Sequence, residues 1–321
     1  MKVLITGGAG FIGSNLAEEL LNDNRITEVR VFDNLSTGLY KNISDFISHP
    51  KFIWIEGDIR DFDACLEASK GVDAILHQAA LGSVPRSIND PLTTNAVNIA
   101  GTLNIFTAAK TNGITKVIYA ASSSTYGDSK SLPKVEQIIG KPLSPYAVTK
   151  LVNELYADVF HQLYGTNFIG LRYFNVFGPK QSPTGAYAAV IPLFANAILN
   201  NQPPYINGDG EQSRDFTFVA NAVQANIKAL FCNDEAAWNQ VYNVACGEQH
   251  TINQLFNSLK SNVSNSNIQP IYREARVGDI PHSLADISKA KTLLHYNPEI
   301  TLTQGLEITL NWYRQNFNYF T

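Results

Sequence analysis

Residues 2–13 read KVLITGGAGFIG, an apolar run followed at once by a turn rich in glycine. The residues of Val3–Thr6 are those of a buried strand, and Asn15–Asn22 is expected to form a helix. Glycines allow a tight turn and a close approach of the backbone to a diphosphate, while the free N–H groups that open a helix attract anions. The stretch therefore predicts a strand–turn–helix unit that binds a nucleotide diphosphate.

Two glycine patterns overlap in this turn, GxxGxxG from Gly7 and GxGxxG from Gly8. A second strand is expected at Glu28–Asp33, and its last residue, Asp33, follows Gly13 by 20 positions. A carboxylate at that place accepts hydrogen bonds from the adenosine ribose and repels a 2′-phosphate, which favours NAD over NADP. An aspartate that merely opens a turn is the alternative interpretation.

Strand and helix patterns alternate through the first half of the chain. Further strands are expected at Phe52–Glu56, Ala74–His77, Lys116–Ala121 and Phe168–Phe174, with helices at Asp61–Ser69, Thr93–Lys110 and Tyr146–Tyr164. Such alternation is typical of βαβ units in a parallel sheet that is covered on both faces. The predicted fold class is α/β, a doubly wound parallel sheet of the Rossmann kind with a smaller C-terminal substrate lobe.

The pattern changes after Phe177. Gly178–Gly185 holds two prolines and two glycines and is expected to be a loop, and a helix follows at Ala188–Leu199. Phe216–Ala220 and Val241–Ala245 have the composition of strands that return to the sheet. We therefore expect an NAD-binding domain formed by residues 1–178 and 216–247, and a substrate-binding lobe formed by residues 179–215 and 248–321.

The composition excludes several classes of protein. The 321 residues carry 24 Lys and Arg against 28 Asp and Glu, a net charge of −4, which argues against a nucleic-acid partner. No run approaches the length of a membrane span, and the first residues lack the long apolar region of a signal peptide, so we expect a cytoplasmic protein with no membrane partner. Three scattered cysteines and six histidines without a close ligand pair predict neither a disulfide framework nor a metal site.

Tyr146 and Lys150 lie four residues apart at the start of a predicted helix, directly after Ser144-Pro145. Residues at this spacing share one helical face, so an ammonium group would lie near a phenol. A nearby positive charge stabilises phenolate, and we expect it to lower the pKa of the tyrosine from about 10 toward neutral pH. Tyr146 is therefore predicted to act as general acid and base. This spacing is frequent by chance, and its position after the fifth predicted strand makes it specific.

Ser122, Ser123 and Ser124 directly follow the predicted strand at residues 116–121. Open α/β sheets bind their ligands at the carboxyl ends of the strands. A hydroxyl at this place could hydrogen-bond a substrate oxygen whose proton Tyr146 removes. A plain serine-rich turn is the alternative interpretation.

Together these motifs resemble an extended short-chain dehydrogenase/reductase. The segments that carry the resemblance are GGAGFIG at Gly7–Gly13, DNLSTG at Asp33–Gly38, SSSTYG at Ser122–Gly127, YAVTK at Tyr146–Lys150 and RYFNVFGP at Arg172–Pro179. The chain is most similar to the UDP-hexose 4-epimerases. ALGSVPRS at Ala80–Ser87 and LPKVE at Leu132–Glu136 resemble the bacterial UDP-N-acetylglucosamine 4-epimerases in particular. The resemblance covers essentially the whole chain.

This resemblance implies an NAD-dependent epimerase that inverts C4 of a UDP-N-acetylhexosamine, UDP-GlcNAc to UDP-GalNAc and back, through a 4-keto intermediate. Tyr146 would move the proton of the 4-hydroxyl with the help of Ser122 or Ser123, and Lys150 would also contact the nicotinamide ribose. The other NAD contacts that the resemblance implies are Gly7, Gly10, Phe11, Ile12, Gly13, Asp33, Asn34, Ser36, Thr37, Gly38, Asp58, Ile59, Gln78, Ala79, Ala80, Asn98, Tyr173 and Val176.

The resemblance also implies where the UDP-sugar would bind. Arg214 and Arg276 would hold the diphosphate, because a guanidinium group matches phosphate oxygens bidentately. A small residue at Ser283 would leave room for an N-acetyl group, where a bulky aromatic residue would exclude it. The other substrate contacts implied are Gly82, Ser83, Ser122, Ser123, Asn175, Gln181, Ala189, Val190, Tyr205, Asn207 and Asp279.

Several alternatives stay open at this point. A UDP-glucose/UDP-galactose or a UDP-uronic-acid 4-epimerase would differ only in the shape of the sugar pocket. The dehydratases and decarboxylases of this superfamily resemble one another in carrying a glutamate two residues before the tyrosine of a YG pair. This chain has Ser124 at that place. The missing acid favours simple inversion at C4 over elimination of water. A non-catalytic NAD-sensing module would lack Tyr146 and Lys150. The family also implies a homodimer in which helices 93–110 and 146–164 form a four-helix bundle, although ordinary core packing would give the same periodicity.

Overall fold

The computed structural model describes residues 1–184, 188–263, 267–275, 281–316 and 318–320. One seven-stranded parallel sheet has the order β11-β6-β5-β4-β1-β2-β3. Its strands are β1 (Lys2–Thr6), β2 (Glu28–Asp33), β3 (Phe52–Glu56), β4 (Ala74–His77), β5 (Lys116–Ser122), β6 (Asn167–Tyr173) and β11 (Gln240–Val244). The chain runs from β1 out to β3 and then returns to β4 on the other side of β1. Such a reversal opens a crevice at the carboxyl ends of these strands, so the predicted fold class is confirmed.

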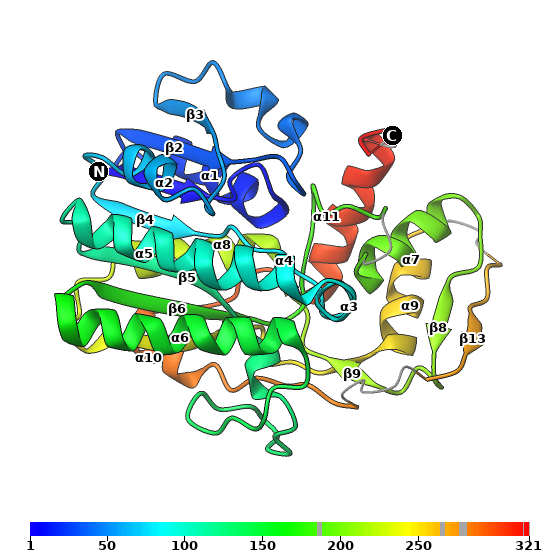
Figure 1. Ribbon diagram of the computed structural model, residues 1–321. Coiled ribbons are helices and arrows are strands. Elements are labelled where there is room, and N and C mark those ends of the chain that lie inside the picture. Colours follow the sequence, from blue (N-terminus) through cyan, green and yellow to red (C-terminus); the bar gives the residue numbers. More distant parts are fainter. Residues whose placement is uncertain (185–187, 264–266, 276–280, 317, 321) are drawn as a thin grey trace.

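Helices cover both faces of the sheet, as Figure 1 shows. One face carries α2 (Phe62–Ala68), α5 (Thr102–Thr111) and α6 (Pro145–Tyr164), and the other carries α1 (Phe11–Asn22), α8 (Val219–Leu230) and α10 (Ser288–Leu294). Two apolar cores result, because successive strand residues point to opposite faces. Val3 and Ile5 belong to one core, and Leu4 belongs to the other. The uninterrupted apolar character of the strands follows from this double burial.

A second, smaller lobe lies at the carboxyl ends of the strands (Figure 1). Its helices are α7 (Val190–Leu199), α9 (Ile252–Ser261) and α11 (Leu302–Gln315), and its short strands are β8 (Tyr205–Asn207), β9 (Ser213–Arg214), β12 (His250–Thr251) and β13 (Ile271–Arg273). The strands pair as β13-β8 and β12-β9, apart from the large sheet. The helix α10 packs on β11 and α8, although its residues fall within the predicted substrate lobe. The division into two domains stays a prediction.

Some predicted elements differ only in where they begin, as α1 does at Phe11, and two differ in kind. Phe216–Ala220 was expected to return to the large sheet, but only Thr217–Phe218 forms a strand, β10, which pairs with β7 (Val176–Phe177) instead. The helix α8 begins immediately afterwards, so the run is too short to cross the sheet. The predicted helix at 93–110 is divided into α4 (Pro91–Asn95), a π-helical segment η3 (Ala96–Gly101) and α5, and it is preceded by α3 (Val84–Asn89). The described residues also form the short 3₁₀ helices η1 (Tyr40–Asn42), η2 (Ser44–Phe46), η4 (Ser123–Tyr126) and η5 (Glu235–Ala237).

Candidate functional site

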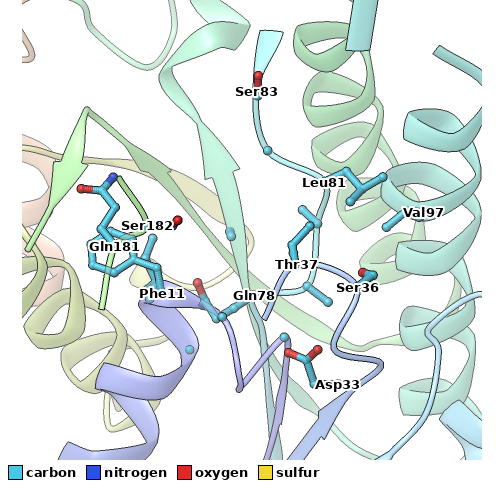
Figure 2. A pocket seen from close by; sticks show the side chains of 18 of the residues that line it. Phe11, Asp33, Ser36, Thr37, Gln78, Leu81, Ser83, Val97, Gln181 and Ser182 are labelled. Atoms are coloured by element: carbon cyan, nitrogen blue, oxygen red, sulfur yellow. The ribbon is translucent and has the colours of Figure 1, made fainter. Parts of the chain in front are cut away.

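A cleft of about 790 Å³ opens where the strands end. Its lining comes from the turn after β1, the loops after β2 and β4, the end of β5 and the start of α6, together with parts of residues 175–184 and 319–320. Figure 2 shows Phe11, Gln181 and Ser182 on one side of the cleft and Leu81 with Val97 on the other. Gln78 lies between these two sides. The cleft thus lies at the place where doubly wound sheets bind their ligands.

The glycine turn forms one wall of this cleft. Gly7 has a φ of +69°, and a Cβ on Gly13 would lie 2.2 Å from the carbonyl oxygen of Gly7, so both positions require glycine. At Gly10 a Cβ would meet only that same oxygen, at 3.1 Å. No side chain caps the start of α1, and Phe11, Ile12 and Gly13 line the cleft there. Uncapped N–H groups at a helix N-terminus fit a diphosphate, and this turn therefore fits a dinucleotide such as NAD.

Asp33 lies at one end of the cleft (Figure 2). Its carboxylate accepts hydrogen bonds from the backbone N–H groups of Ala9, at 3.0 Å, and Leu35, at 2.8 Å, through different oxygens. Burial raises the pKa of this carboxyl group, and the backbone donors oppose that shift. Each oxygen keeps a free lone pair, so Asp33 can still accept hydrogen bonds from ribose hydroxyls.

Asp58 lines the same end of the cleft. Arg60 contacts both of its oxygens, with a shortest N–O distance of 2.6 Å, and the Asn34 amide donates to it at 2.8 Å. The hydrogen bond from Arg60 is the main reason why the pKa of Asp58 is lowered to about 2. The carboxylate is therefore ionised at neutral pH and available as an acceptor for an adenine amino group.

The start of α6 positions Tyr146 at the cleft. Ser144 caps the helix by accepting the Ala147 N–H at 3.1 Å, and Pro145 occupies its first turn. Tyr146 lines the cleft together with Ser122, whose hydroxyl lies close enough to the phenol to lower its pKa. The Oγ of Ser122 already accepts two bonds from Ser124, from its N–H at 3.2 Å and its hydroxyl at 2.9 Å. Since a hydroxyl has two acceptor sites and one proton, Ser122 has its proton left for the phenol.

The expected lowering of the Tyr146 pKa proved wrong. Burial raises the pKa of the phenol, and the hydrogen bond from Ser122 opposes this shift without reversing it. Lys150 donates from Nζ to the carbonyl oxygen of Ala120 at 2.8 Å, and its Nζ lies 5.9 Å from the centre of the Tyr146 ring. Burial also lowers the pKa of Lys150 to about 8. The sequence spacing predicts that the two groups are neighbours, but it does not include the cost of desolvating them.

A buried ion pair supports Lys150 from the next turn of α6. Glu154 binds Arg172 through two hydrogen bonds, at 2.9 and 2.7 Å, and the two side chains are only 9% and 3% exposed. Arg172 also donates to the carbonyl oxygen of Glu136 at 3.0 Å. The charge of Glu154 raises the pKa of Lys150 and partly offsets the effect of burial. The pair therefore fixes α6 against β6 and helps Lys150 to stay protonated.

Most of the residues predicted to form the site lie together in this cleft. Those that line it are Gly7, Gly10, Phe11, Ile12, Gly13, Asp33, Asn34, Ser36, Thr37, Asp58, Ile59, Gln78, Ala79, Ala80, Gly82, Ser83, Ser122, Ser123, Tyr146, Lys150, Tyr173, Asn175, Val176 and Gln181. Their roles toward cofactor and substrate stay predictions.

Eight predicted residues lie elsewhere in the described chain. Gly38 packs against Ala9 of the glycine turn. Asn98 is fully buried, and its amide holds the backbone of Leu81, which lines the cleft, through bonds of 2.8 and 3.1 Å. The remaining six belong to the second lobe and are not part of the cleft lining: Ala189, Val190, Tyr205, Asn207, Arg214 and Ser283. Arg276 and Asp279 lie outside the residues that the structure describes.

The cleft also contains residues that the sequence reasoning missed. These are Phe32, Leu39, Asn42, Gly57, Leu81, Val84, Val97, Ala120, Ala121, Lys180, Ser182, Thr184, Tyr319 and Phe320. Several are direct neighbours of predicted residues, so the motifs could have been extended by a position or two. Tyr319 and Phe320 carry no such signal, because only the packing of the chain brings them to the cleft.

The acidic and basic residues of the cleft are few. Among the described residues that line it, Asp33 and Asp58 are the only carboxylates, and Lys150 and Lys180 are the only cations. No group of three or more His, Cys, Asp or Glu side chains suited to a metal ion occurs in the described part of the chain. Within the same residues, none of the helices is long and apolar enough to span a membrane.

A parallel sheet with a glycine turn, a carboxylate at the end of β2 and a Ser–Tyr–Lys group at the end of β5 defines an extended short-chain dehydrogenase/reductase. Residues 3–245 match the model of the NAD dependent epimerase/dehydratase family. The chain belongs to this family, and its cofactor is NAD.

Several known proteins that are similar to this chain along its whole length have names that refer to UDP-sugars. The UDP-glucose 4-epimerase of Mycolicibacterium smegmatis is 34% identical over 316 residues, which are 98% of this chain and 99% of that protein. The UDP-N-acetylglucosamine 4-epimerase of Methanobrevibacter ruminantium, solved in complex with UDP-N-acetylmuramic acid, is 42% identical with a TM-score of 0.92 and covers 98% of both chains. The UDP-glucose 4-epimerase of Thermotoga maritima, solved with UDP-glucose, is 33% identical with a TM-score of 0.92, over 99% of this chain and 100% of the other.

Proposed function

We propose that this UDP-sugar 4-epimerase interconverts UDP-GlcNAc and UDP-GalNAc. The coarser assignment, inversion at C4 of a UDP-sugar, rests on the family and on the similarity to the named epimerases. The choice of the acetylated sugar rests on the motifs of the sequence and on the 42% identical neighbour named for that substrate. The single observation that carries the chemistry is that Ser122, Tyr146 and Lys150 line the same cleft, with Nζ of Lys150 5.9 Å from the centre of the Tyr146 ring.

In this proposal the glycine turn and Asp33 would hold NAD, which would supply the reversible exchange of hydride at C4 of the sugar through a 4-keto intermediate. Tyr146 takes the proton of the 4-hydroxyl and later gives it back, so one residue serves both half-reactions. Ser122 holds the phenol and stabilises its ionised form by donating a hydrogen bond. Lys150, fixed by the carbonyl of Ala120 at 2.8 Å, supplies positive charge close to the phenol and would contact the nicotinamide ribose.

The charges of the cleft favour a simple inversion of an uncharged sugar. Elimination of water would need an acid at the sugar, whereas the carboxylates among the described lining residues, Asp33 and Asp58, lie at the end proposed for adenosine. A uronic acid would need a cation for its carboxylate. Lys180 is already paired with Glu18 at 2.7 Å, and Lys150 is engaged beside the phenol. The second candidate is therefore a UDP-glucose/UDP-galactose 4-epimerase, which the names of two relatives support.

The second lobe would hold the UDP part of the substrate. Arg214 lies on β9 and would bind the diphosphate with Asn175, whose amide donates to the carbonyl of Asp215 at 3.0 Å. Tyr205 on β8 would contact the uracil, and its ring is already covered by Arg273, with the guanidinium carbon 3.1 Å from the ring centre. Ser283 directly follows His282, which forms a β-bridge with Ser213. The N–H of Ser283 donates to the carbonyl oxygen of Ser213 at 3.0 Å, and its side chain would border the sugar.

Competing substrates test this proposal most directly. We expect kcat/KM, followed by NMR of the anomeric proton, to be higher for UDP-GlcNAc than for UDP-Glc. Ser283→Tyr should lower kcat/KM about tenfold or more for UDP-GlcNAc and leave UDP-Glc within about threefold, since one misfitting group in a pocket costs ~1–3 kcal/mol. Ser283→Ala is the matched control and should preserve both rates. Equal losses for both sugars, or a preference for UDP-Glc in the parent enzyme, would contradict the acetylated substrate.

The proposal includes a homodimer and a cytoplasmic location. Large apolar side chains lie exposed along one side of α6, namely Val148, Leu155, Val159 and Leu163, of which Leu163 is 66% exposed. An exposed apolar stripe on a long helix is typical of a helix-bundle interface. Leu155→Glu should convert a dimer to a monomer in light scattering after gel filtration, and an unchanged mass would rule this interface out. The three free cysteines are compatible with a reducing compartment.

A further inference from the structure

The segment at residues 318–320, which follows α11, reaches the cofactor cleft from the second lobe. Tyr319 and Phe320 both line the cleft. The same cleft is lined by the glycine turn and by Ser36 and Thr37 of the loop after β2. These two aromatic side chains are therefore a wall of the dinucleotide site that no motif of the sequence indicates.

Tyr319 is joined to the glycine turn by a continuous series of hydrogen bonds. Its phenol donates to Oδ1 of Asn42 at 2.9 Å, and Nδ2 of Asn42 donates to the carbonyl oxygen of Ala9 at 2.7 Å. The N–H of Ala9 in turn donates to Asp33 at 3.0 Å. Asn42 is only 4% exposed, so its amide has little freedom to rotate away from these partners. The position of Tyr319 is thus coupled to the turn and to the carboxylate that line the cleft.

An aromatic cluster anchors this segment to α11. The ring centre of Tyr319 lies 4.8 Å from that of Trp312 and 5.1 Å from that of Phe320. Phe320 also packs against Trp312 at 6.0 Å and Tyr313 at 6.4 Å. The ammonium of Lys41, in η1, lies 4.5 Å from the centre of the Tyr319 ring. Contacts of this kind stabilise a defined side-chain position by more than apolar burial alone.

From these contacts we propose that Tyr319 and Phe320 retain the bound NAD. Phe320 forms part of the wall of the cleft, and Tyr319 acts as a positioning residue that holds Asn42 and, through it, the glycine turn. NAD must stay bound through each reaction cycle, because the same hydride leaves and returns. The inference rests on the NAD site and not on the choice of sugar, so it can fail while the proposed substrate stands.

The test measures release of the cofactor from the folded, full-length protein. NADH is loaded, and its dissociation is followed by stopped-flow energy transfer from tryptophan, with NAD content after purification as a second readout. Tyr319→Phe removes only the hydroxyl and should raise the dissociation rate about fivefold, the loss expected for one hydrogen bond. Phe320→Ala should raise it at least as much. Tyr272→Phe is the matched control, because its phenol makes the same kind of bond, to Oδ1 of Asn253 at 3.0 Å, outside the cleft.

A double-mutant cycle separates this role from simple packing. If Tyr319 acts through Asn42, then Tyr319→Phe should add little to the dissociation rate in an Asn42→Ala background. Thermal melting of the same variants shows whether they remain folded. The proposal fails if Tyr319→Phe and Phe320→Ala release NADH at the rate of the Tyr272→Phe control. It also fails if the fold-change in the NADH dissociation rate of the double variant equals the product of the fold-changes of the two single variants at Tyr319 and Asn42.

Discussion

Ser122 and Ser123 both line the cleft beside Tyr146, and the hydrogen-bond pattern distinguishes them. Ser122 accepts two hydrogen bonds from Ser124 and has its own proton free for the phenol. The Ser122 hydroxyl lowers the pKa of Tyr146 and so opposes the effect of burial. Ser122→Ala removes this donor. A hydrogen bond to a charged group contributes ~1.5–3 kcal/mol, and each pKa unit corresponds to ~1.4 kcal/mol. At the lower end of this range, we expect the pKa of Tyr146 to rise by about one unit when the hydroxyl is removed.

The direction of the rate change follows from the form of Tyr146 that reacts. Phenolate is the base, and below the pKa its fraction falls about tenfold for each unit by which the pKa rises. Ser122→Ala should therefore lower kcat/KM about tenfold at neutral pH and move the rising limb of the pH profile about one unit upward. The assay is the initial rate of sugar inversion between about pH 6 and 10 with NAD in excess, and the pKa of Tyr146 is read from its phenolate absorbance at higher pH, by difference from the Tyr146→Phe form of each protein.

Two further variants make this experiment decisive. Ser123→Ala should leave the rising limb in place, and Ser122→Thr, which keeps a hydroxyl, should restore it. Loss of the Lys150 charge above its pKa of about 8 affects all of these proteins alike. An unchanged pKa of Tyr146 in Ser122→Ala, or a raised one in Ser123→Ala, would refute this assignment.

Three other changes test separate parts of the structure. Gly10→Ala should keep the melting temperature and weaken NAD binding about tenfold in calorimetry, whereas Gly13→Ala, whose Cβ would lie 2.2 Å from a carbonyl oxygen, should destabilise the fold by ~2–4 kcal/mol. Glu154→Gln leaves Arg172 buried without its partner and should lower the free energy of unfolding by ~3–5 kcal/mol in urea titrations, so an unchanged midpoint would contradict the buried pair. Asp33→Ser removes the charge that repels a 2′-phosphate, so NADP binding, measured by fluorescence, should tighten about tenfold. If the wild-type protein already binds NADP as tightly as NAD, then Asp33 does not discriminate between the two cofactors.

The sequence was sufficient for the large sheet and for the arrangement around the glycine turn. Strand β1, Gly7 to Gly13 and Asp33 form one local unit, so their relation is encoded within a short stretch of chain. The Tyr146 and Lys150 pair is likewise local, being one turn of α6. Where the spacing of neighbours decides a feature, the pattern of residues was enough to predict it.

Other features depend on contacts between distant segments. The run at Phe216–Ala220 has strand composition, but pairing with β7 and the start of α8 limit it to two residues. The raised pKa of Tyr146 depends on burial, which no spacing reveals. Tyr319 and Asn42 are 277 positions apart in the sequence, so no local pattern at either residue predicts their hydrogen bond.

The separation between the large sheet and the small paired strands has a practical meaning. The proton-transfer group and the glycine turn are attached to one continuous sheet, while β8, β9, β12 and β13 belong to two-stranded sheets of their own. Exchange of residues 200–214 for those of a relative with another sugar preference would leave every strand of the large sheet intact. Grafting experiments of this kind would let an engineer alter what the enzyme recognises without rebuilding the machinery that moves the proton.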